Sequence, residues 1–320
     1  MTVPGFGALF PGQLSEKPGT GEALAARFDF VAAWFERVSR RSGVDLSGTF
    51  FGSGAPSLHD DLPAQVGVFA ASVAALDALE KIHGLVPAAA AGYSLGTYAA
   101  FVAAGALERE AALDVLLAAQ RLLDEYRRAN ADRPGGMGFV IGLSRGDVEA
   151  ALAGSGVDIA TENAAQQFVV SGERAAVVEA VERLRPKALR AEILPLAQCM
   201  HSPRLGDVTR RLKILLEGKT AIRTPKLHLY APMLGRRISS LEETSSVLLL
   251  QISRPSLWSS TLAAMGADGF SVFAEVGPGD VLTKLLRWTL REAKGFVVES
   301  PEGAEAFARA ILPSEVTSSA

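Results

Sequence analysis

The segment from Ala88 to Ala100, AAAAGYSLGTYAA, is the stretch that most constrains the fold. A compact apolar run, typical of a buried strand, leads into the pattern G-x-S-x-G, and an alanine-rich helical pattern follows at once. Glycines at positions 92 and 96 permit a sharp turn, where larger side chains would clash with neighbouring elements. This order predicts a strand–turn–helix unit whose turn lifts the Ser94 hydroxyl out of the edge of a sheet.

The order of predicted strands and helices differs between two parts of the chain. Strand-like and helix-like segments alternate through residues 1–133 and 199–314, which favours a mainly parallel sheet covered by helices on both faces. Residues 134–198 instead follow the order β-α-β-β-α-β of a ferredoxin-like unit. We predict an α/β fold in which an α/β-hydrolase-like large subdomain with a parallel-sheet core is interrupted by a ferredoxin-like small subdomain at 134–198. Residues 315–320 are expected to form a disordered tail.

The composition excludes several classes of protein. With 48% hydrophobic and 21% charged residues the chain has an ordinary globular balance, and its net charge of −3 speaks against nucleic acid or an anionic membrane as partner. The single cysteine, Cys199, excludes a disulfide framework and a cysteine-based zinc site. No signal peptide and no apolar run of about 20 residues is expected. A cytoplasmic protein without a metal or redox cofactor is therefore predicted.

Ser94 is a candidate nucleophile because of its place on the turn. A serine at the start of a helix lies among unpaired N–H groups that favour a developing negative charge, and the N–H of Leu95 is the natural first oxyanion donor. The alternative is a glycine-rich turn in which Ser94 only caps the helix.

A serine nucleophile needs a base, and the chain has four histidines. His59 lies in a polar loop and His83 at the end of a helix. His228 lies in a predicted strand, KLHLYAP, in which polar and apolar residues alternate. His201, in QCMHSPRL, comes just after a strand and just before a helix, where a loop could aim it at the serine. We predict His201 as the base; the alternative is that it only caps the following helix.

Seven segments resemble, in order, the motifs of the malonyl-CoA:acyl-carrier-protein transacylase family, which includes acyltransferase domains of polyketide and fatty acid synthases. The resemblance covers nearly the whole chain. The segments are LFPGQ at 9–13, GYSLGTYAA, AAQRLLDE, ENAAQQFVVSG, CMHSPRL, LLQISRPSLW and FAEVGPGDVLTKL.

The resemblance implies a role for each matched catalytic residue. Ser94 would form an acyl-enzyme, with His201 as base, and the backbone carbonyl of Gln251 would orient the histidine in place of an acid. The N–H groups of Gln13 and Leu95 would form the oxyanion hole.

The resemblance also implies which residues bind the acyl group. It places Arg121 where the family holds the carboxylate of a malonyl group, a task that suits a planar guanidinium. Asn163 matches a motif asparagine, and Met200 borders the acyl pocket. The alternative for Arg121 is a surface arginine paired with Asp124 or Glu125.

Four positions depart from the family pattern. Leu14 stands where glycine is usual, Tyr93 where histidine is usual and Thr97 where glutamate is usual, and Met200 replaces a smaller or aromatic residue. These departures favour a specialised relative over the housekeeping enzyme.

We therefore predict a monomeric enzyme that moves malonyl, or a related dicarboxylic acyl group, from coenzyme A to the phosphopantetheine thiol of an acidic acyl carrier protein. A discrete enzyme of polyketide or other specialised biosynthesis is favoured. The alternatives are a malonyltransferase associated with malonate decarboxylase, a proofreading thioesterase on the same fold, and a catalytically silent docking module. Charged helices near Arg210, Arg211 and Arg287 are candidates for a basic docking face.

Overall fold

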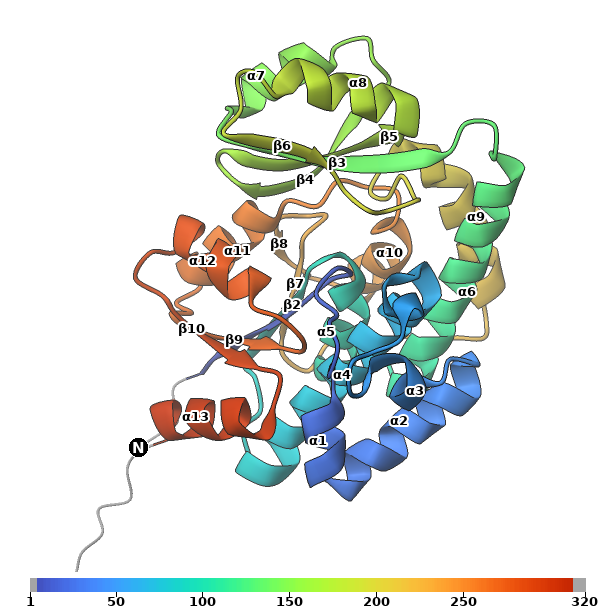
Figure 1. Ribbon diagram of the computed structural model, residues 1–320. Helices are drawn as coiled ribbons and strands as arrows, with labels where there is room; N and C mark the ends of the chain where they lie inside the picture. Colours follow the sequence, from blue (N-terminus) through green and yellow to red (C-terminus); the bar gives the residue numbers. More distant parts are fainter. Residues whose placement is uncertain (1–4, 313–320) are drawn as a thin grey trace, which may run out of the picture.

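The computed structural model describes residues 5–312, so the predicted tail at 315–320 lies outside the described residues. Within this range the strands form a six-stranded and a four-stranded sheet, one above the other in Figure 1. Neighbouring strands of the larger sheet are parallel, apart from the antiparallel pair β7–β8. Its strand order is β10 (Lys294–Val298), β9 (Val272–Val276), β1 (Gly7–Phe10), β2 (Ala89–Gly92), β7 (His228–Ala231) and β8 (Arg236–Arg237).

The larger sheet is buried on both faces. Ala8 and Phe10 of β1 point into one hydrophobic core, whereas Leu9 between them points into another. The first core is built with α2 (Asp29–Ser42), α4 (Asp61–His83), α5 (Thr97–Ala103), α6 (Arg109–Ala129) and α13 (Pro301–Ile311), and the second with α11 (Trp258–Ala267) and α12 (Val281–Thr289). The remaining helices of this part are α1 (Glu22–Arg27), α3 (Leu46–Phe50), α9 (Gly206–Leu216) and α10 (Leu241–Leu250). The predicted α/β class with a parallel-sheet core is confirmed.

Helix α4 corrects one sequence expectation. Its 23 residues are long and apolar enough to cross a membrane by length and composition, although no such run was expected. The helix lies in the core, and 89% of its most apolar window is buried within the fold. Its apolar surface is therefore explained by packing against the large sheet and its covering helices.

The smaller sheet carries helices on only one face. Its antiparallel strands run in the order β4 (Asp158–Ala164), β5 (Gln167–Glu173), β3 (Gly135–Ile141) and β6 (Arg190–Ile193). Helices α7 (Arg145–Leu152) and α8 (Arg174–Leu184) pack on one face, and the other face of the sheet is turned toward the large sheet (Figure 1). The order along the chain is strand, helix, two strands, helix, strand. The division into subdomains at 134–198 stays a prediction.

One strand-like contact ties the smaller sheet to the rest of the molecule. The N–H of Ser256 donates to the carbonyl of Ala160, 2.8 Å away, and the N–H of Glu162 donates to the carbonyl of Ser256 at the same distance. The segment at 256 thereby extends the edge strand β4, and this fixes the smaller sheet above the end of β2 where Ser94 lies.

Candidate active site

Ser94 sits on a turn whose geometry its glycine neighbours make possible. The backbone φ of Ser94 is +52°, a left-handed conformation that a non-glycine residue adopts rarely. A Cβ at position 92 would lie 2.2 Å from the carbonyl carbon of Gly96, and a Cβ at position 96 would lie 2.1 Å from the carbonyl oxygen of Phe10. Glycine is therefore required on both sides of the serine, and the packed neighbours hold the strained turn in place.

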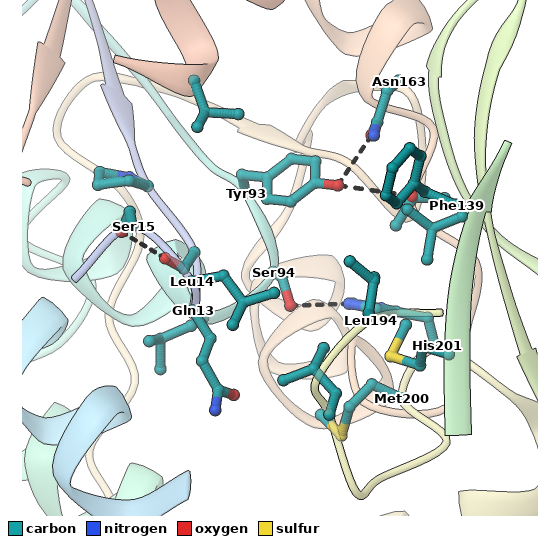
Figure 2. A pocket seen from close by; sticks show the side chains of 18 of the residues that line it. Gln13, Leu14, Ser15, Tyr93, Ser94, Phe139, Asn163, Leu194, Met200 and His201 are labelled. Atoms are coloured by element: carbon teal, nitrogen blue, oxygen red, sulfur yellow. Dashed lines mark hydrogen bonds between the residues drawn. The ribbon is translucent and has the colours of Figure 1, made fainter. Parts of the chain in front are cut away.

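His201 faces this serine from a loop that follows the smaller sheet. The distance from His201 Nε2 to Ser94 Oγ is 2.8 Å, as the dashed line in Figure 2 shows. The histidine also has a left-handed backbone, with φ at +58°, and its N–H donates to the carbonyl of Ile252 at 2.8 Å. The structure thus brings the predicted nucleophile and the predicted base into direct contact.

Two backbone carbonyls act on His201, and the stronger of them is not the one expected. His201 Nδ1 lies 3.2 Å from the carbonyl oxygen of Arg254, whereas the sequence comparison assigned this task to Gln251. Arg254 is three residues further on, in the turn after α10, and the backbone of Gln251 has a weaker effect on the ring. Because a carbonyl only accepts, Nδ1 carries the ring proton and Nε2 offers its lone pair to Ser94.

Burial sets the charge of this imidazole. The side chain is 3% exposed, and removal from water lowers the pKa of His201 below its usual value of about 6.5. The carbonyl contacts oppose this shift without reversing it. His201 is consequently neutral at pH 7 and able to accept a proton from Ser94.

Ser94 and His201 line a cavity of about 630 Å³ between the two sheets. Strands of the smaller sheet supply one side, and the loop after β1, the Ser94 turn, helices α4, α6 and α12 and the loop at 194–201 supply others. Figure 2 shows labelled side chains from several of these segments around the cavity. Just over half of the 28 residues that line it have apolar side chains: Pro11, Leu14, Leu95, Ala119, Leu123, Met137, Phe139, Ile141, Val169, Leu194, Leu196, Met200, Ile252, Val281 and Leu282.

The loop after β1 brings the predicted oxyanion residues to the cavity. Gln13 lines the cavity together with Leu95. Leu14 adopts φ +72°, so it keeps the left-handed backbone that glycine would adopt more easily, and its N–H donates to the Glu16 carboxylate at 2.7 Å. The side-chain amide of Gln13 donates to Asp61 at 3.3 Å. The oxyanion role of the Gln13 and Leu95 N–H groups stays a prediction.

Tyr93 and Asn163 form a polar pair in the wall of the cavity. The Tyr93 hydroxyl donates to Asn163 Oδ1 at 2.9 Å, and the ring of Tyr93 meets that of Trp258 edge to face, with centroids 5.3 Å apart. Burial raises the pKa of Tyr93, so the phenol stays protonated. Tyr93, which replaces the usual histidine, therefore holds the side chain of Asn163 in place. Met200 lines the same cavity.

Arg121 does not reach the cavity, which corrects the prediction that it holds the carboxylate of the acyl group. It is exposed, and it is not among the described residues that line the cavity. On α6 the exposed positions Asp114, Arg121 and Arg128 recur every seven residues, so they form the outer stripe of the helix. Leu117 and Ala118, which share the face of Arg121 at helical spacing, are only half-buried.

A glutamine pair that was not predicted from the sequence lies at the inner wall instead. Gln65 of α4 lines the cavity, and its Nε2 donates to Oε1 of Gln120 at 2.8 Å. The two residues are 8% and 2% exposed. The buried stripe of α6 through Leu116, Gln120 and Leu123 could have identified Gln120, because these positions share the inward face at helical spacing.

One arginine does line the cavity, at its rim. Arg190 of β6 donates to both carboxylate oxygens of Glu192, at 2.7 and 3.1 Å, and its guanidinium lies 5.0 Å from the centroid of the Phe139 ring. Its side chain is 60% exposed. Among the residues of 5–312 that line the cavity, it is the only arginine or lysine.

The segment FAEVGPGDVLTKL has a structural part in this site. Glu275 at the end of β9 is fully buried and accepts hydrogen bonds from the N–H groups of Leu282 and Thr283, at 3.0 and 2.8 Å. Burial raises the pKa of this carboxyl group. Glu275 thereby anchors the first turn of α12, which carries Val281 and Leu282 into the cavity wall.

Comparison with known proteins places this geometry among acyltransferases. The model of the acyl transferase domain matches residues 9–306. The polyketide biosynthesis protein ThaF of Burkholderia thailandensis is 31% identical over 316 residues, which are 98% of this chain and 26% of ThaF. The chain thus spans about a quarter of the length of that relative. The malonyl CoA-acyl carrier protein transacylase of Haemophilus influenzae is 31% identical over 289 residues, 88% of this chain and 91% of the relative.

Solved structures agree with these matches. The acyl-carrier-protein-S-malonyltransferase from Bartonella henselae superposes with a TM-score of 0.87 at 30% identity, covering 96% of this chain and 99% of that one. A malonyl-transacylase solved in complex with its type II polyketide synthase acyl-carrier protein superposes with a TM-score of 0.89 at 26% identity, covering 96% and 99%.

Proposed function

The chain belongs to the acyltransferase family, and we propose that it moves an acyl group from a coenzyme A thioester to the phosphopantetheine thiol of a carrier protein through an acyl-Ser94 intermediate. The observation that carries this proposal is the 2.8 Å contact between Ser94 Oγ and His201 Nε2 inside a cavity large enough for a thioester.

The chemistry proceeds in two half-reactions. His201 Nε2 takes the proton of Ser94 while Oγ attacks the thioester carbonyl carbon, and the N–H groups of Gln13 and Leu95 stabilise the oxyanion. The C–S bond then breaks, and the coenzyme A thiolate leaves with the proton from His201. In the second half, the carrier thiol gives its proton to His201 and attacks the Ser94 ester, and the carbonyl passes to sulfur as Oγ recovers the proton.

The names of the relatives support malonyl as the acyl group and a carrier protein as the acceptor. Malonyl-CoA is accordingly the first donor to test, and the polyketide context of ThaF supports a role in specialised biosynthesis. The monomeric state and the cytoplasmic location stay predictions.

Of the proposed basic residues, Arg210 pairs with Asp207 at 2.9 Å and Arg211 with Glu125 at 2.5 Å. Arg287 on α12, beside the 70% exposed Trp288, is therefore the better candidate to contact an acidic carrier protein.

Mass spectrometry of the intact chain after incubation with malonyl-CoA and other acyl-CoAs tests the proposal. An adduct of the acyl mass is expected in the native chain, loss of the adduct in Ser94→Ala, and transfer of the acyl group when a phosphopantetheinylated carrier protein is added. A native chain that takes up no acyl group from any donor would support the silent docking module instead.

A proofreading thioesterase is the second candidate, and the position of Arg121 favours it. A transferase that selects malonyl needs a cation to bind the malonyl carboxylate, whereas a hydrolase that removes acyl groups from carrier proteins does not. Arg121, the cation expected for this task, lies outside the cavity. The lifetime of acyl-Ser94 separates the two functions. A transferase keeps the ester until carrier protein is added, whereas a hydrolase releases free acid in buffer alone.

A further inference from the structure

We infer that the cavity of this chain binds an uncharged aliphatic acyl group in preference to malonyl. The inference rests on the proposed function, because it names the class of acyl group that Ser94 carries. It comes from the charges and polar groups that face the cavity in the described residues, taken wall by wall.

The inner wall is neutral. Gln65, Tyr98, Ala119, Leu123 and Ile252 line it, and none of them carries a charge. Burial raises the pKa of Tyr98, which keeps its phenol protonated. A carboxylate moved from water to this wall would lose its hydration without gaining an ion pair, and such a transfer is strongly unfavourable.

The charged residues behind this wall increase the cost of placing the carboxylate of a malonyl group there. Gln120 holds Gln65 and itself donates to Asp124 Oδ1 at 3.1 Å. The nearby guanidinium of Arg127 is shared between Asp124 at 3.1 Å and Asp61 at 3.3 Å. One cation therefore already serves two carboxylates there, and an acyl carboxylate at the inner wall would meet net negative charge.

The cation at the rim is also engaged. Arg190 donates to both carboxylate oxygens of Glu192 through Nε and Nη2, and its guanidinium lies over Phe139. A malonyl carboxylate would have to displace Glu192 from a two-armed pair in a position open to solvent, where ion pairs contribute little. Arg190 thus provides no selective site for a carboxylate.

The wall beneath the smaller sheet is neutral apart from Arg190, because its polar residues Thr161, Asn163 and Gln167 carry no charge, and its apolar part favours an alkyl chain. Phe139, Val169, Leu194, Leu196 and Met200 face the cavity beneath the smaller sheet. Each CH₂ group buried against such a surface improves binding about fourfold at 25 °C. Affinity is therefore expected to rise along the series acetyl, butyryl, hexanoyl, while malonyl gains nothing from these contacts.

Acylation of Ser94 by a panel of donors tests the inference on the native chain. With malonyl-, acetyl-, butyryl- and hexanoyl-CoA, the kcat/KM for butyryl-CoA is expected to exceed that for malonyl-CoA by at least about tenfold. A higher value for malonyl-CoA than for butyryl-CoA overturns the inference and leaves acyl transfer through Ser94 intact. Failure of every donor to label Ser94 overturns the proposed function and this inference together.

Two variants locate the cause of the preference. Gln120→Arg places a guanidinium next to Gln65 and is expected to raise the malonyl-to-butyryl ratio of kcat/KM about tenfold or more. Gln120→Met, of similar volume but without charge, is the matched control and is expected to leave malonyl disfavoured. Arg190→Ala is expected to change all donors alike, and a loss confined to malonyl-CoA would overturn the inference. Melting temperatures of the variants check that each one folds.

Discussion

The two ends of the cavity are built by different means. At the reaction end, Ser94 and His201 sit on turns with left-handed backbones, at φ +52° and +58°, and their side chains meet at 2.8 Å. At the acyl end, the wall consists of ordinary helix faces on α4 and α6, where Gln65 and Gln120 pair. The reaction end keeps the serine and the histidine of the family pattern, whereas Arg121, the cation that the resemblance implied for the acyl end, lies outside the cavity.

The contrast shows which residue roles of a family can be assigned to a single chain from a sequence match. A strained turn admits few sequences, because a Cβ at Gly92 or Gly96 would overlap neighbouring backbone atoms. A helix face accepts many side chains of suitable volume, and a change there alters what is bound without altering the fold. The predictions below test this contrast between a rigid reaction end and a variable acyl end.

The largest effect is expected at the reaction end. His201→Ala removes the base that Ser94 needs, and kcat/KM for acyl transfer is expected to fall about a thousandfold for every donor. His228→Ala is the matched control, since His228 is exposed and contacts Arg237. A His201→Ala variant that keeps a tenth of the native rate would contradict the assignment of the base.

The next effect concerns the turn itself. In Gly96→Ala the new Cβ would lie 2.1 Å from the carbonyl oxygen of Phe10 and 2.8 Å from that of Pro11, and backbone atoms yield little. We expect the free energy of unfolding to fall by about 3 kcal/mol, measured by urea denaturation. Gly146→Ala on α7 is the control, because its nearest neighbour lies 4.0 Å away. Equal stability of the two variants would mean that the turn is not rigid.

The pH profile of the reaction end follows from burial. Removal from water lowers the pKa of His201 below about 6.5, and only the neutral imidazole accepts a proton from Ser94. The rate kcat/KM is therefore expected to hold down to pH 6.5 and to fall about tenfold per pH unit below the lowered pKa. An acid limb centred above pH 7 would show that the imidazole is solvated in the working enzyme.

A smaller effect is expected between the two ends, at Tyr93. Tyr93→Phe removes the hydroxyl that donates to Asn163 at 2.9 Å and leaves the amide oxygen, which is in a residue only 5% exposed, without that donor. The free energy of unfolding is expected to fall by about 1 kcal/mol, with the malonyl-to-butyryl ratio unchanged. In a double-mutant cycle with Asn163→Ala the two losses should overlap; fully additive losses would show that the hydrogen bond contributes nothing.

Features that depend on a short contiguous stretch of residues could be predicted from the sequence. The turn at Ser94, the approach of His201 to it, the parallel sheet and the order of strands and helices through residues 134–198 were all predicted from contiguous patterns. Two features were not. The carbonyl of Arg254 acts on the His201 ring more strongly than that of Gln251, because the path of a turn decides which oxygen points at the ring. The inward residue of α6 is Gln120, one position and about 100° of helical rotation away from Arg121, and a motif match does not resolve that rotation.

The smallest effect is expected at Arg121, and it gives the sharpest test of this rotation. Arg121→Ala should change the free energy of unfolding by less than about 0.5 kcal/mol, because the side chain is exposed on the outer stripe of α6. Arg109→Ala on the same helix is the matched contrast, since Arg109 bonds the 2% exposed Asp77 with two contacts at 2.7 and 2.9 Å, and its loss should cost about 3 kcal/mol.

In the same experiment, kcat/KM of Arg121→Ala for malonyl-CoA and for butyryl-CoA should each stay within about twofold of the native chain, because neither acyl group contacts an exposed side chain outside the cavity. A tenfold loss confined to malonyl-CoA would place the carboxylate beside Arg121. The acyl end would then carry the cation that the resemblance implied, with α6 turned from the orientation described, and the contrast between the two ends of the cavity would disappear.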